Sequence, residues 1–459
     1  MAHKSASFHK KQHFLHLCNS VPKDKILFCP IDVSKHFHIA FFHDINCQPL
    51  SDFFDFSSSK VGFDFFISRI QSFISTFSPQ LIFIGCEPTS IYYEGLMQNL
   101  YLRYRDSLSP RFQLCIVDPL AVKLNRQQHS LHAKKNDYID TAVIGELLSR
   151  GLYSPAHFLS PPYLQIKELS LSIDYYRQQQ LRLWNRTLTT IERVFPNLFI
   201  QYNDEEPFCK KPLQSGLLND LLHLCPDPWQ ILSLSNSELI DLFHQQGRPL
   251  GPKKADKIVE AAHRALLLDK AHQAIHLKTL SHQLDTLDFL KQQINTLTIQ
   301  ICELIRLTSA RHLVAIAGNS EKLTGDFLAA LGDPHRYHFV QQVWSAAGLA
   351  PSCVQSGQKS SRPKVSKTGS FHLRQAIYKM SATIVWHEPT FGLPCFERLL
   401  AGRPFVPTIV HIGRKLVSTA LAILKSDQPF QAPFEDYNQA KAKLLQLQQQ
   451  YQKQKKRRG

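Results

Sequence analysis

The fold is decided by the stretch Phe28-Cys29-Pro30-Ile31-Asp32-Val33-Ser34-Lys35, in which a single acidic residue ends an apolar run. Residues 26–31 predict a buried strand, and residues 36–42 predict a second strand after a tight turn. Asp32 is then expected where the two strands diverge, and the strand end holds its carboxylate rigidly. Because a divalent cation taken from water needs several oxygen ligands, a metal site requires more carboxylates in similarly firm places.

Two downstream segments supply such carboxylates. Residues 81–86 predict another short apolar strand, which stops at Glu87 and is followed by a helix. A later helix is expected to open at Asp137, and a spacing of three residues places Asp137 and Asp140 on one face of it. Taken alone, Asp137 is equally typical of a first-turn acid that the helix dipole favours. Together the four acids point to a metal site.

The sequence resembles a known family, the DEDD transposases of bacterial insertion sequences, which act as bridge-RNA-guided DNA recombinases. The resemblance extends over residues 25–430, and the order and spacing of its short motifs make it specific. The matching segments are residues 31–35, 87–92, 136–142, 347–351, 355–357 and 367–374.

The resemblance implies the fold class. It implies an α/β N-terminal domain that is ribonuclease-H-like (resolvase-like), which the order of strands and helices over residues 26–150 also fits. A central helical coiled-coil region and a mainly α C-terminal transposase domain follow. The expected parts are a basic N-terminal arm (1–24), the DEDD catalytic domain (25–155), the helical region (156–308, with an insert at 203–265), the serine transposase domain (309–430) and a basic tail (431–459).

Three of these parts carry expectations of their own. Leucine and isoleucine recur every three or four residues over 277–304, which predicts a coiled coil within the chain or between chains. The arm over residues 1–19 is interrupted by Lys10 and Lys11, so it is expected to be loose and not a signal peptide. The basic end of the tail, residues 453–458, is expected to be unstructured.

Composition limits the partners. The 459 residues carry a net charge of +16 with a pI near 9.3, which indicates a polyanionic partner, most simply nucleic acid. No apolar run approaches the ~20 residues that a membrane span needs, so no membrane partner is expected. The 10 cysteines form no C-x-x-C pair, which argues against a zinc ribbon and favours reduced thiols. We therefore expect a cytoplasmic bacterial protein associated with the nucleoid.

A polar, basic stretch over residues 355–364 has neither helical nor strand periodicity, so it predicts an exposed loop. Its hydroxyls at Ser356, Ser360 and Ser361 are chemically equivalent as nucleophiles. The resemblance selects Ser356, because the family's nucleophilic serine lies in the Ser-Gly step that matches Ser356-Gly357. Basic side chains on this stretch and on the helices beyond it are expected to bind nucleic acid: Lys359, Arg362, Lys364, Lys367, Arg374, His411, Arg414 and Lys415.

The resemblance also implies a mechanism. Asp32, Glu87, Asp137 and Asp140 would hold one or two Mg²⁺ ions, and Ser356 would attack the scissile phosphate to form a phosphoserine intermediate. The enzyme would be a DNA transposase that moves an insertion sequence. Its partners would be target and donor DNA, a noncoding bridge RNA and further copies of itself, as a dimer to tetramer.

Two other readings use the same residues. A hydrolytic, metal-dependent nuclease of the Holliday-junction type would need the four acids with water as nucleophile. A non-catalytic nucleic-acid-binding scaffold would need only the basic charge. Replacing Ser356 by Ala separates the recombinase from the nuclease, and replacing Asp32 by Asn separates both from the scaffold.

Overall fold

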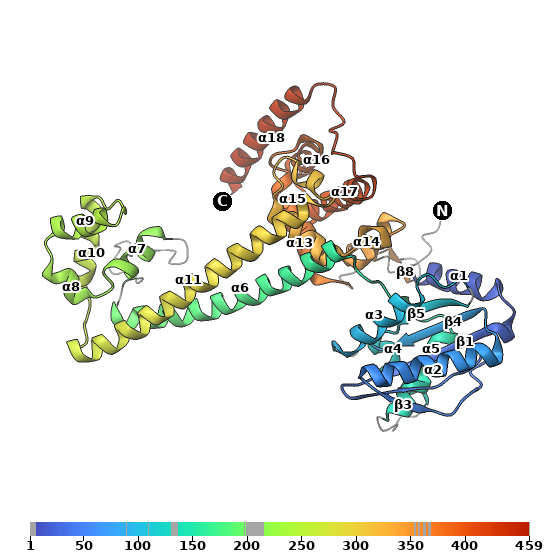
Figure 1. The fold of residues 1–459 in the computed structure, drawn as a ribbon. Helices are drawn as coiled ribbons and strands as arrows, with labels where there is room; N and C mark the ends of the chain where they lie inside the picture. Colours follow the sequence, from blue (N-terminus) through green and yellow to red (C-terminus); the bar gives the residue numbers. More distant parts are fainter. Residues whose placement is uncertain are drawn as a thin grey trace. The chain divides into compact units, whose positions relative to one another are not determined.

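The computed structural model describes residues 6–458 except 89, 109, 130–135, 197, 199–214, 353–354, 357–358, 361–363 and 366–368. The chain divides into two compact units (Figure 1). The first comprises Met1–Ser160 with Arg336–Ser345, and the second comprises Pro161–His335 with Ala346–Gly459. The finer domain boundaries expected from the sequence stay a prediction.

A six-stranded sheet forms the centre of the first unit, in the order β3-β2-β1-β4-β5-β6. The central strands β1, β4 and β5 are parallel, while β2, β3 and β6 are antiparallel to their neighbours. Parallel strands buried on both faces read as continuous apolar runs, as β1 and β4 do. The strands are β1 (Ile26–Val33), β2 (Phe37–Ala40), β3 (Phe54–Ser57), β4 (Leu81–Cys86), β5 (Arg111–Ile116) and β6 (Ser154–Pro155).

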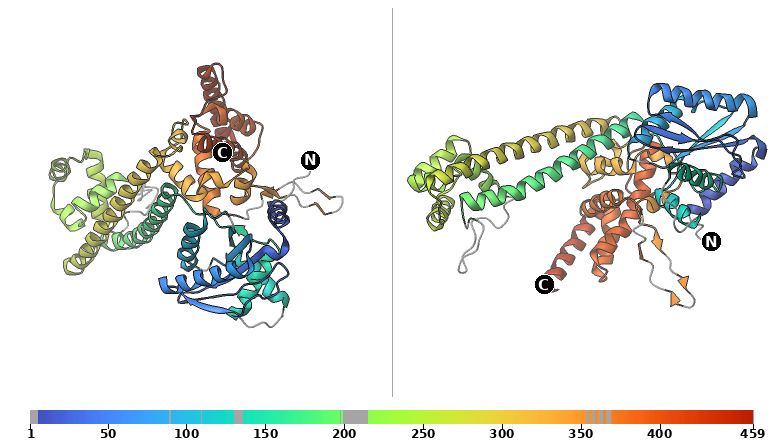
Figure 2. Two further views of the ribbon diagram at one scale, coloured as in Figure 1. Left: turned by 45° about the vertical axis from the view of Figure 1, so that its right-hand side comes forward. Right: turned by 90° about the horizontal axis from the view of Figure 1, so that it is seen from below.

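Helices cover both faces of this sheet (Figure 2). One apolar cluster joins α2 (Lys60–Phe77) and α3 (Tyr92–Tyr104) to one face. A second cluster joins α1 (Ala6–Asn19), α4 (Pro119–His129) and α5 (Asp137–Ser149) to the other. The predicted mixed α/β N-terminal domain is thus confirmed, and the rest of the described chain is mostly helical.

The loose N-terminal arm is a wrong prediction, because residues 6–19 form helix α1. Phe14 is 5% exposed, and its ring lies 5.6 Å from that of Phe83 in β4 and 6.1 Å from that of Tyr153. Cys18 is also buried in the same cluster. Helix α1 covers an apolar part of the sheet. Because this contact joins residues far apart in the sequence, the basic and polar composition of the segment alone does not predict it.

Two long helices, α6 (Pro161–Val194) and α11 (Lys270–Arg306), lie side by side in the second unit (Figure 1). They are antiparallel, since the amide of Gln273 near the start of α11 donates to the carbonyl of Val194 at the end of α6 (2.7 Å). Much of the predicted leucine stripe packs within the chain, against four shorter helices as well as α6. These are α7 (Gly216–Leu224), α8 (Pro228–Ser233), α9 (Asn236–Gln245) and α10 (Pro252–Arg264).

Among its described residues, the carboxyl-terminal part is mainly helical and contains short two-residue strands. Its helices are α12 (Arg311–Val314), α13 (Glu321–Leu331), α14 (Val340–Ala346), α15 (Phe371–Ile384), α16 (Pro389–Leu400), α17 (Phe405–Ser426) and α18 (Tyr437–Arg458). Its strands are β7 (Pro351–Ser352), β8 (Gln355–Ser356), β9 (Lys359–Ser360) and β10 (Lys364–Val365). The pairs β7–β10 and β8–β9 are antiparallel, so the described parts of the predicted loop are paired strands instead.

The unstructured tail is also a wrong prediction, because α18 continues to Arg458. Its apolar side packs on α16, with Leu444 1% exposed and the Tyr451 ring 5.7 Å from that of Phe396. Lys453, Lys455 and Lys456 occupy its last turns, where the negative end of the helix dipole favours cations. Packing of the preceding turns and the dipole together keep the basic end helical.

Candidate active site

Asp32 and Glu87 lie at the ends of neighbouring strands. The register pairs Ile31 of β1 with Cys86 of β4, so each acid directly follows a paired residue, and adjacent strands are about 4.8 Å apart. Asp32 still belongs to β1 and pairs with Ile39 of β2, so the sheet holds its backbone in place. Burial raises the pKa of the Cys86 thiol, and the charges of Glu87 and Asp32 raise it further.

Both acids lie on the face of the sheet that α5 covers. Along β1, Leu27, Cys29 and Ile31 enter the cluster with α2 and α3, while Ile26 and Phe28 enter the cluster with α5. Side chains alternate along a strand, so Asp32 lies on the α5 side with Ile26 and Phe28. The same alternation over β4, where Leu81 and Phe83 face α5, carries Glu87 to that side. Each of the two acids is half-buried.

Helix α5 packs on β1 and β4 near the residues that precede the two acids. Tyr153, just after the helix, packs on the Phe83 ring at 5.9 Å, whereas Leu148 lies over Gly85 and Gly145 lies over Pro30. Because Pro30 and Gly85 are paired, these two contacts show that α5 packs across β1 and β4 in the carboxyl-terminal half of each strand. A Cβ at Gly145 would lie 3.1 Å from Pro30 Cγ and 2.8 Å from His43 Nε2, so only glycine permits this close approach.

The first turn of α5 carries the other two acids. Asn136 caps the helix, since its side chain accepts from the Tyr138 amide (2.9 Å). Asp137 is exposed, whereas Asp140 is 4% exposed. Asp32 and Glu87 thus follow paired residues of two adjacent strands, while Asp137 and Asp140 lie in the first turn of the helix that packs on these strands, with Asp140 the most enclosed of the four.

Sequence reasoning missed helix α4 and its residue Arg126. The Nη1 of Arg126 donates to both carboxylate oxygens of Asp140, at 2.5 and 2.7 Å. The side chains are 19% and 6% exposed, so this is a largely buried ion pair. A signal for α4 was present, because Asp118 before Pro119 is typical of a helix start, and its carboxylate accepts from the Leu120 amide (2.8 Å).

The donor chemistry of the four acids fits a hard divalent cation, since carboxylate oxygens are the ligands that Mg²⁺ prefers. Within the described part of the chain, no three His, Cys, Asp or Glu side chains are gathered closely enough to hold a metal ion. Asp140 instead directs its carboxylate to Arg126. The four acids thus have the donor chemistry for a metal, and one of them, Asp140, is paired with a cation of the protein.

Ser356 belongs to the second unit, in β8, where it pairs with Lys359 of β9. Its neighbours Arg362 and Lys367 lie outside the described residues. Lys364 is in β10, which pairs with β7. The predicted nucleophile therefore lies in a strand pair and not in irregular chain.

Two of the predicted nucleic-acid residues bind the backbone just before β7. Arg374 Nη1 donates to the carbonyl of Ala347 (2.9 Å), and Arg414 Nε donates to the carbonyl of Leu349 (2.9 Å). Burial lowers the pKa of Arg414. Both guanidinium groups thus hold the segment that leads into the strands around Ser356.

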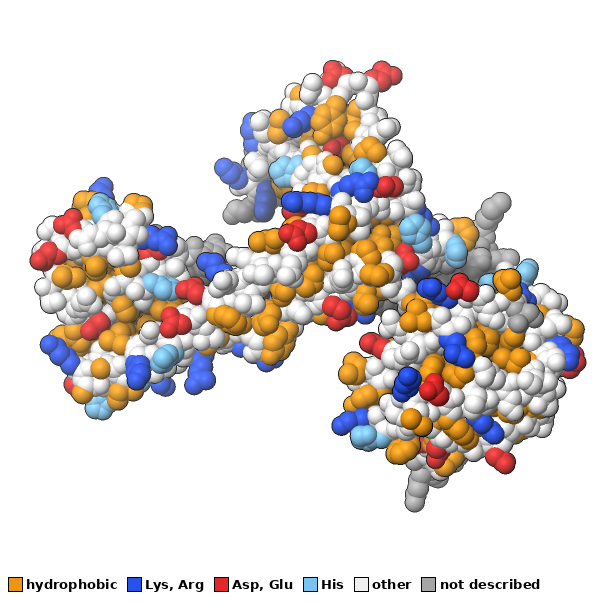
Figure 3. All heavy atoms as spheres, viewed as in Figure 1, with side chains coloured by type: hydrophobic (Ala, Val, Ile, Leu, Met, Phe, Trp, Pro, Cys, Tyr) orange, Lys and Arg blue, Asp and Glu red, His pale blue; other side chains and the backbone are white. Residues whose placement is uncertain are grey.

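The other two predicted residues on α17 lie close by. Lys415 donates to the carbonyl of Thr390 (3.0 Å) at the start of α16. His411 is exposed on the same helix, and desolvation, with the charges of Arg398 and Arg414, lowers its pKa. On the face shown in Figure 3, lysine and arginine side chains are spread over both units and do not gather in one patch.

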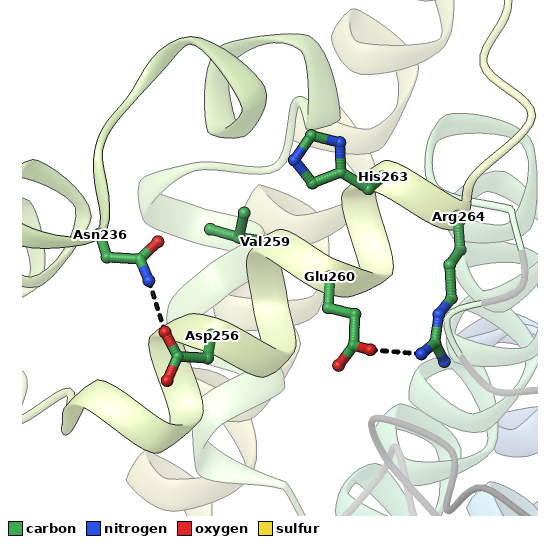
Figure 4. Close-up of a pocket in the computed structure, with 6 residues that line it drawn as sticks. All are labelled: Asn236, Asp256, Val259, Glu260, His263 and Arg264. Carbon is green, nitrogen blue, oxygen red and sulfur yellow. Dashed lines mark hydrogen bonds and ion pairs between the residues drawn. The ribbon is translucent and has the colours of Figure 1, made fainter.

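A pocket elsewhere in the second unit lies between α9 and α10 (Figure 4). Its polar side chains bind one another, since Asn236 donates to Asp256 and Arg264 pairs with Glu260. Val259 and His263 complete the lining. None of the predicted site residues contributes to it.

Comparisons with known proteins place the chain in a class. Residues 29–196 match a transposase model of the IS110 DEDD type, and residues 310–393 match the Transposase IS116/IS110/IS902 family. The two ranges together span more than half of the chain and define a protein of the transposase class. The chain belongs to the IS110-type DEDD transposase/recombinase family, which confirms the resemblance found in the sequence.

Two curated relatives are pilin gene-inverting proteins. That of Moraxella bovis is 29% identical over 180 residues, which cover 36% of this chain and 54% of that protein. That of Moraxella lacunata is 28% identical over the same lengths. The chain thus spans about half the length of these curated relatives.

Among solved structures, T. thermophilus RuvC in complex with a Holliday junction substrate is similar at 10% identity and a TM-score of 0.22. The similarity covers 28% of this chain and 99% of that one, and it is too weak to assign a function. No helix in the described part of the chain is long and apolar enough to span a membrane.

Proposed function

We propose that this protein is a metal-dependent DNA recombinase that cuts and rejoins DNA through a phosphoserine at Ser356 and so moves an insertion sequence. One observation carries the proposal. Asp32 and Glu87 end adjacent strands on the face covered by α5, and Asp137 and Asp140 lie in the first turn of that helix. Carboxylate oxygens are the ligands that a hard divalent cation such as Mg²⁺ prefers, and these four come from separate segments of one unit.

Asp32, Glu87, Asp137 and Asp140 would hold one or two Mg²⁺ ions. When bound, the metal would polarise the phosphate and stabilise the leaving oxygen. We further propose that the unit containing the acids is ribonuclease-H-like and that α6 and α11 form a coiled coil, as the sequence predicts.

The covalent step belongs to the other unit. Ser356 Oγ would form a bond to the scissile phosphorus as the bond from phosphorus to the departing DNA oxygen breaks, and the serine proton leaves to solvent. The phosphoserine retains the phosphodiester energy, so a DNA hydroxyl can attack it and reseal the strand without ATP. Lys359, Arg362, Lys364 and Lys367 would neutralise charge on the phosphate.

Arg374 and Arg414 would act as positioning residues, because each holds a backbone carbonyl just before β7. His411 and Lys415 would extend the DNA contact along α17. Target DNA, donor DNA and a bridge RNA are the proposed partners, in a dimer to tetramer where the acids of one copy serve the serine of another. The net charge of +16 suits such partners.

A trapping experiment tests the proposal. The full chain, with a bridge RNA and a nicked donor duplex in Mg²⁺, should give a protein–DNA adduct that survives denaturing electrophoresis. Ser356→Ala should form none. Ser360→Ala, at a position in β9 that pairs with Gln355 and not with Ser356, should still form the adduct. Asp32→Asn should also abolish cleavage.

The other readings predict different results. Cleavage that persists in Ser356→Ala, with no adduct in the wild type, would identify a hydrolytic nuclease. Absence of cleavage in every sample, with DNA binding that is unchanged in Asp32→Asn, would identify a scaffold.

A further inference from the structure

Asp140 is engaged by a cation of the protein itself. Arg126 Nη1 lies 2.5 and 2.7 Å from the two carboxylate oxygens, and Asp140 is 4% exposed. Hydrogen bonds between charged groups are about twice as strong as neutral ones, and burial strengthens them. A metal ion that takes Asp140 as a ligand must therefore compete with this ion pair.

Helix α4 holds Arg126 in place. The amide of Asn125 donates to Glu146 of α5 (3.1 Å), and Val122 packs in the cluster that contains Val143 and Leu147. The guanidinium thus approaches Asp140 from a packed helix and not from a flexible surface side chain. The packing of α4 on α5 therefore fixes the position of the Arg126 guanidinium.

We propose that Arg126 is a positioning residue that orients the Asp140 carboxylate before metal binds, and that metal binding exchanges this ion pair for a metal ligand. The inference rests on the proposed function, because it requires the four acids to form a metal site. The energetic reason is simple: an unpaired buried carboxylate would destabilise the protein without metal, and Arg126 removes that cost. The consequence is a metal affinity lower than the acids alone would give.

Titration of Mn²⁺ alone into the full chain, followed by calorimetry, measures the competition without any reaction. Arg126→Ala should bind Mn²⁺ roughly tenfold more tightly or better, since a charge-assisted hydrogen bond no longer has to be broken. The melting temperature of this variant should be lower without metal and should rise more on adding Mn²⁺ than that of the wild type. Arg126→Gln, which retains a neutral donor and spares the fold more, should lie between the two in affinity.

Two control variants separate this bond from other effects. Lys123→Ala removes the same charge from an exposed position of α4, and Asn125→Ala removes the other link between α4 and α5. Each should change the Mn²⁺ affinity by no more than about twofold. A tightening in Lys123→Ala equal to that in Arg126→Ala would reduce the effect to general electrostatics and overturn the inference.

The outcomes also separate this inference from the proposed function. If Asp32→Asn abolishes Mn²⁺ binding while Arg126→Ala and Arg126→Gln bind as the wild type does or more weakly, the metal site stands and the exchange of Arg126 is wrong. If Mn²⁺ binding is absent in the wild type or unaffected by Asp32→Asn, the metal site itself is wrong and both proposals fail.

Discussion

Two histidines of the first unit are almost completely buried. His43 is 1% exposed, its ring stacks on that of Phe28 at 5.1 Å, and its Nε2 meets the space above Gly145. Burial lowers its pKa, although its hydrogen bond to the Asp44 carbonyl and the charge of Asp44 act in the opposite direction. His38, 3% exposed, also has its pKa lowered by burial. Both rings are therefore neutral in the folded protein at neutral pH.

These histidines predict a loss of stability in weak acid. Their folded pKa values lie below the unfolded value of 6.5, so their contribution is present above pH 6.5 and is lost as the pH falls through the folded values. Between pH 7.5 and 5.5 each buried histidine should cost at most about 1.4 kcal/mol of unfolding free energy. Urea unfolding at the two pH values measures this loss.

The variant His43→Gln cannot titrate, so it should show a smaller loss between the two pH values even though it is less stable at both. His36→Gln, at an exposed position of the same unit, should retain the wild-type loss. Equal losses in the wild type and His43→Gln would contradict this assignment.

At the scale of elements, α18 shows how a polar helix is held. Its Tyr437 hydroxyl donates to Glu388 (2.9 Å), which is 2% exposed and caps α16 through the Thr390 amide. Burial, followed by the hydrogen bond to Glu388 and its charge, raises the pKa of Tyr437 to about 12. Further along, Leu444 lies over Gly392, where a Cβ would come within 2.7 Å of it. Both ends of the contact are thus tied to α16.

The neighbouring leucines of α18 make a matched pair for mutation. Leu444 is 1% exposed and Leu445 is 52% exposed. Leu444→Ala should lower the unfolding free energy by about 2–5 kcal/mol, because it leaves a cavity against α16. Leu445→Ala should change it by less than about 0.5 kcal/mol. Chemical denaturation of the two variants tests the packing of the helix, and equal effects would show that α18 is not docked in this way.

At the scale of the whole molecule, charge governs the expected partners. The net charge of +16 predicts nucleic-acid binding that weakens steeply with salt. Lys453, Lys455 and Lys456 are exposed on the last turns of α18. Because this end is helical and not a free tail, its lysines can contact only phosphates that pass along the helix.

Replacing these three lysines by Gln should reduce the slope of log K against log salt by about 0.9 for each lysine that contacts a phosphate. Fluorescence anisotropy with a duplex of random sequence at several salt concentrations measures the slope. Lys→Arg at the same positions keeps the charge and should keep the slope. An unchanged slope in the Gln variant would exclude α18 from the DNA contact.

The sequence by itself determined the strands that end at Asp32 and Glu87, the helix that opens at Asp137, and the family. These features depend on local periodicity and on residue order, which neighbouring residues encode. Side chains alternate between the two faces of the sheet along each strand. Once the register of β1 against β4 is known, the sequence therefore also predicts that Asp32 and Glu87 share one face.

Only the tertiary structure decided which partners those residues meet. It showed that Arg126 binds Asp140, that Arg374 and Arg414 hold backbone carbonyls, and that the polar ends of the chain form the packed helices α1 and α18. A charged side chain pairs with whatever group the fold brings near it, and a polar segment becomes ordered when a distant apolar surface needs covering. Both depend on contacts between residues far apart in the sequence, so local pattern does not contain them.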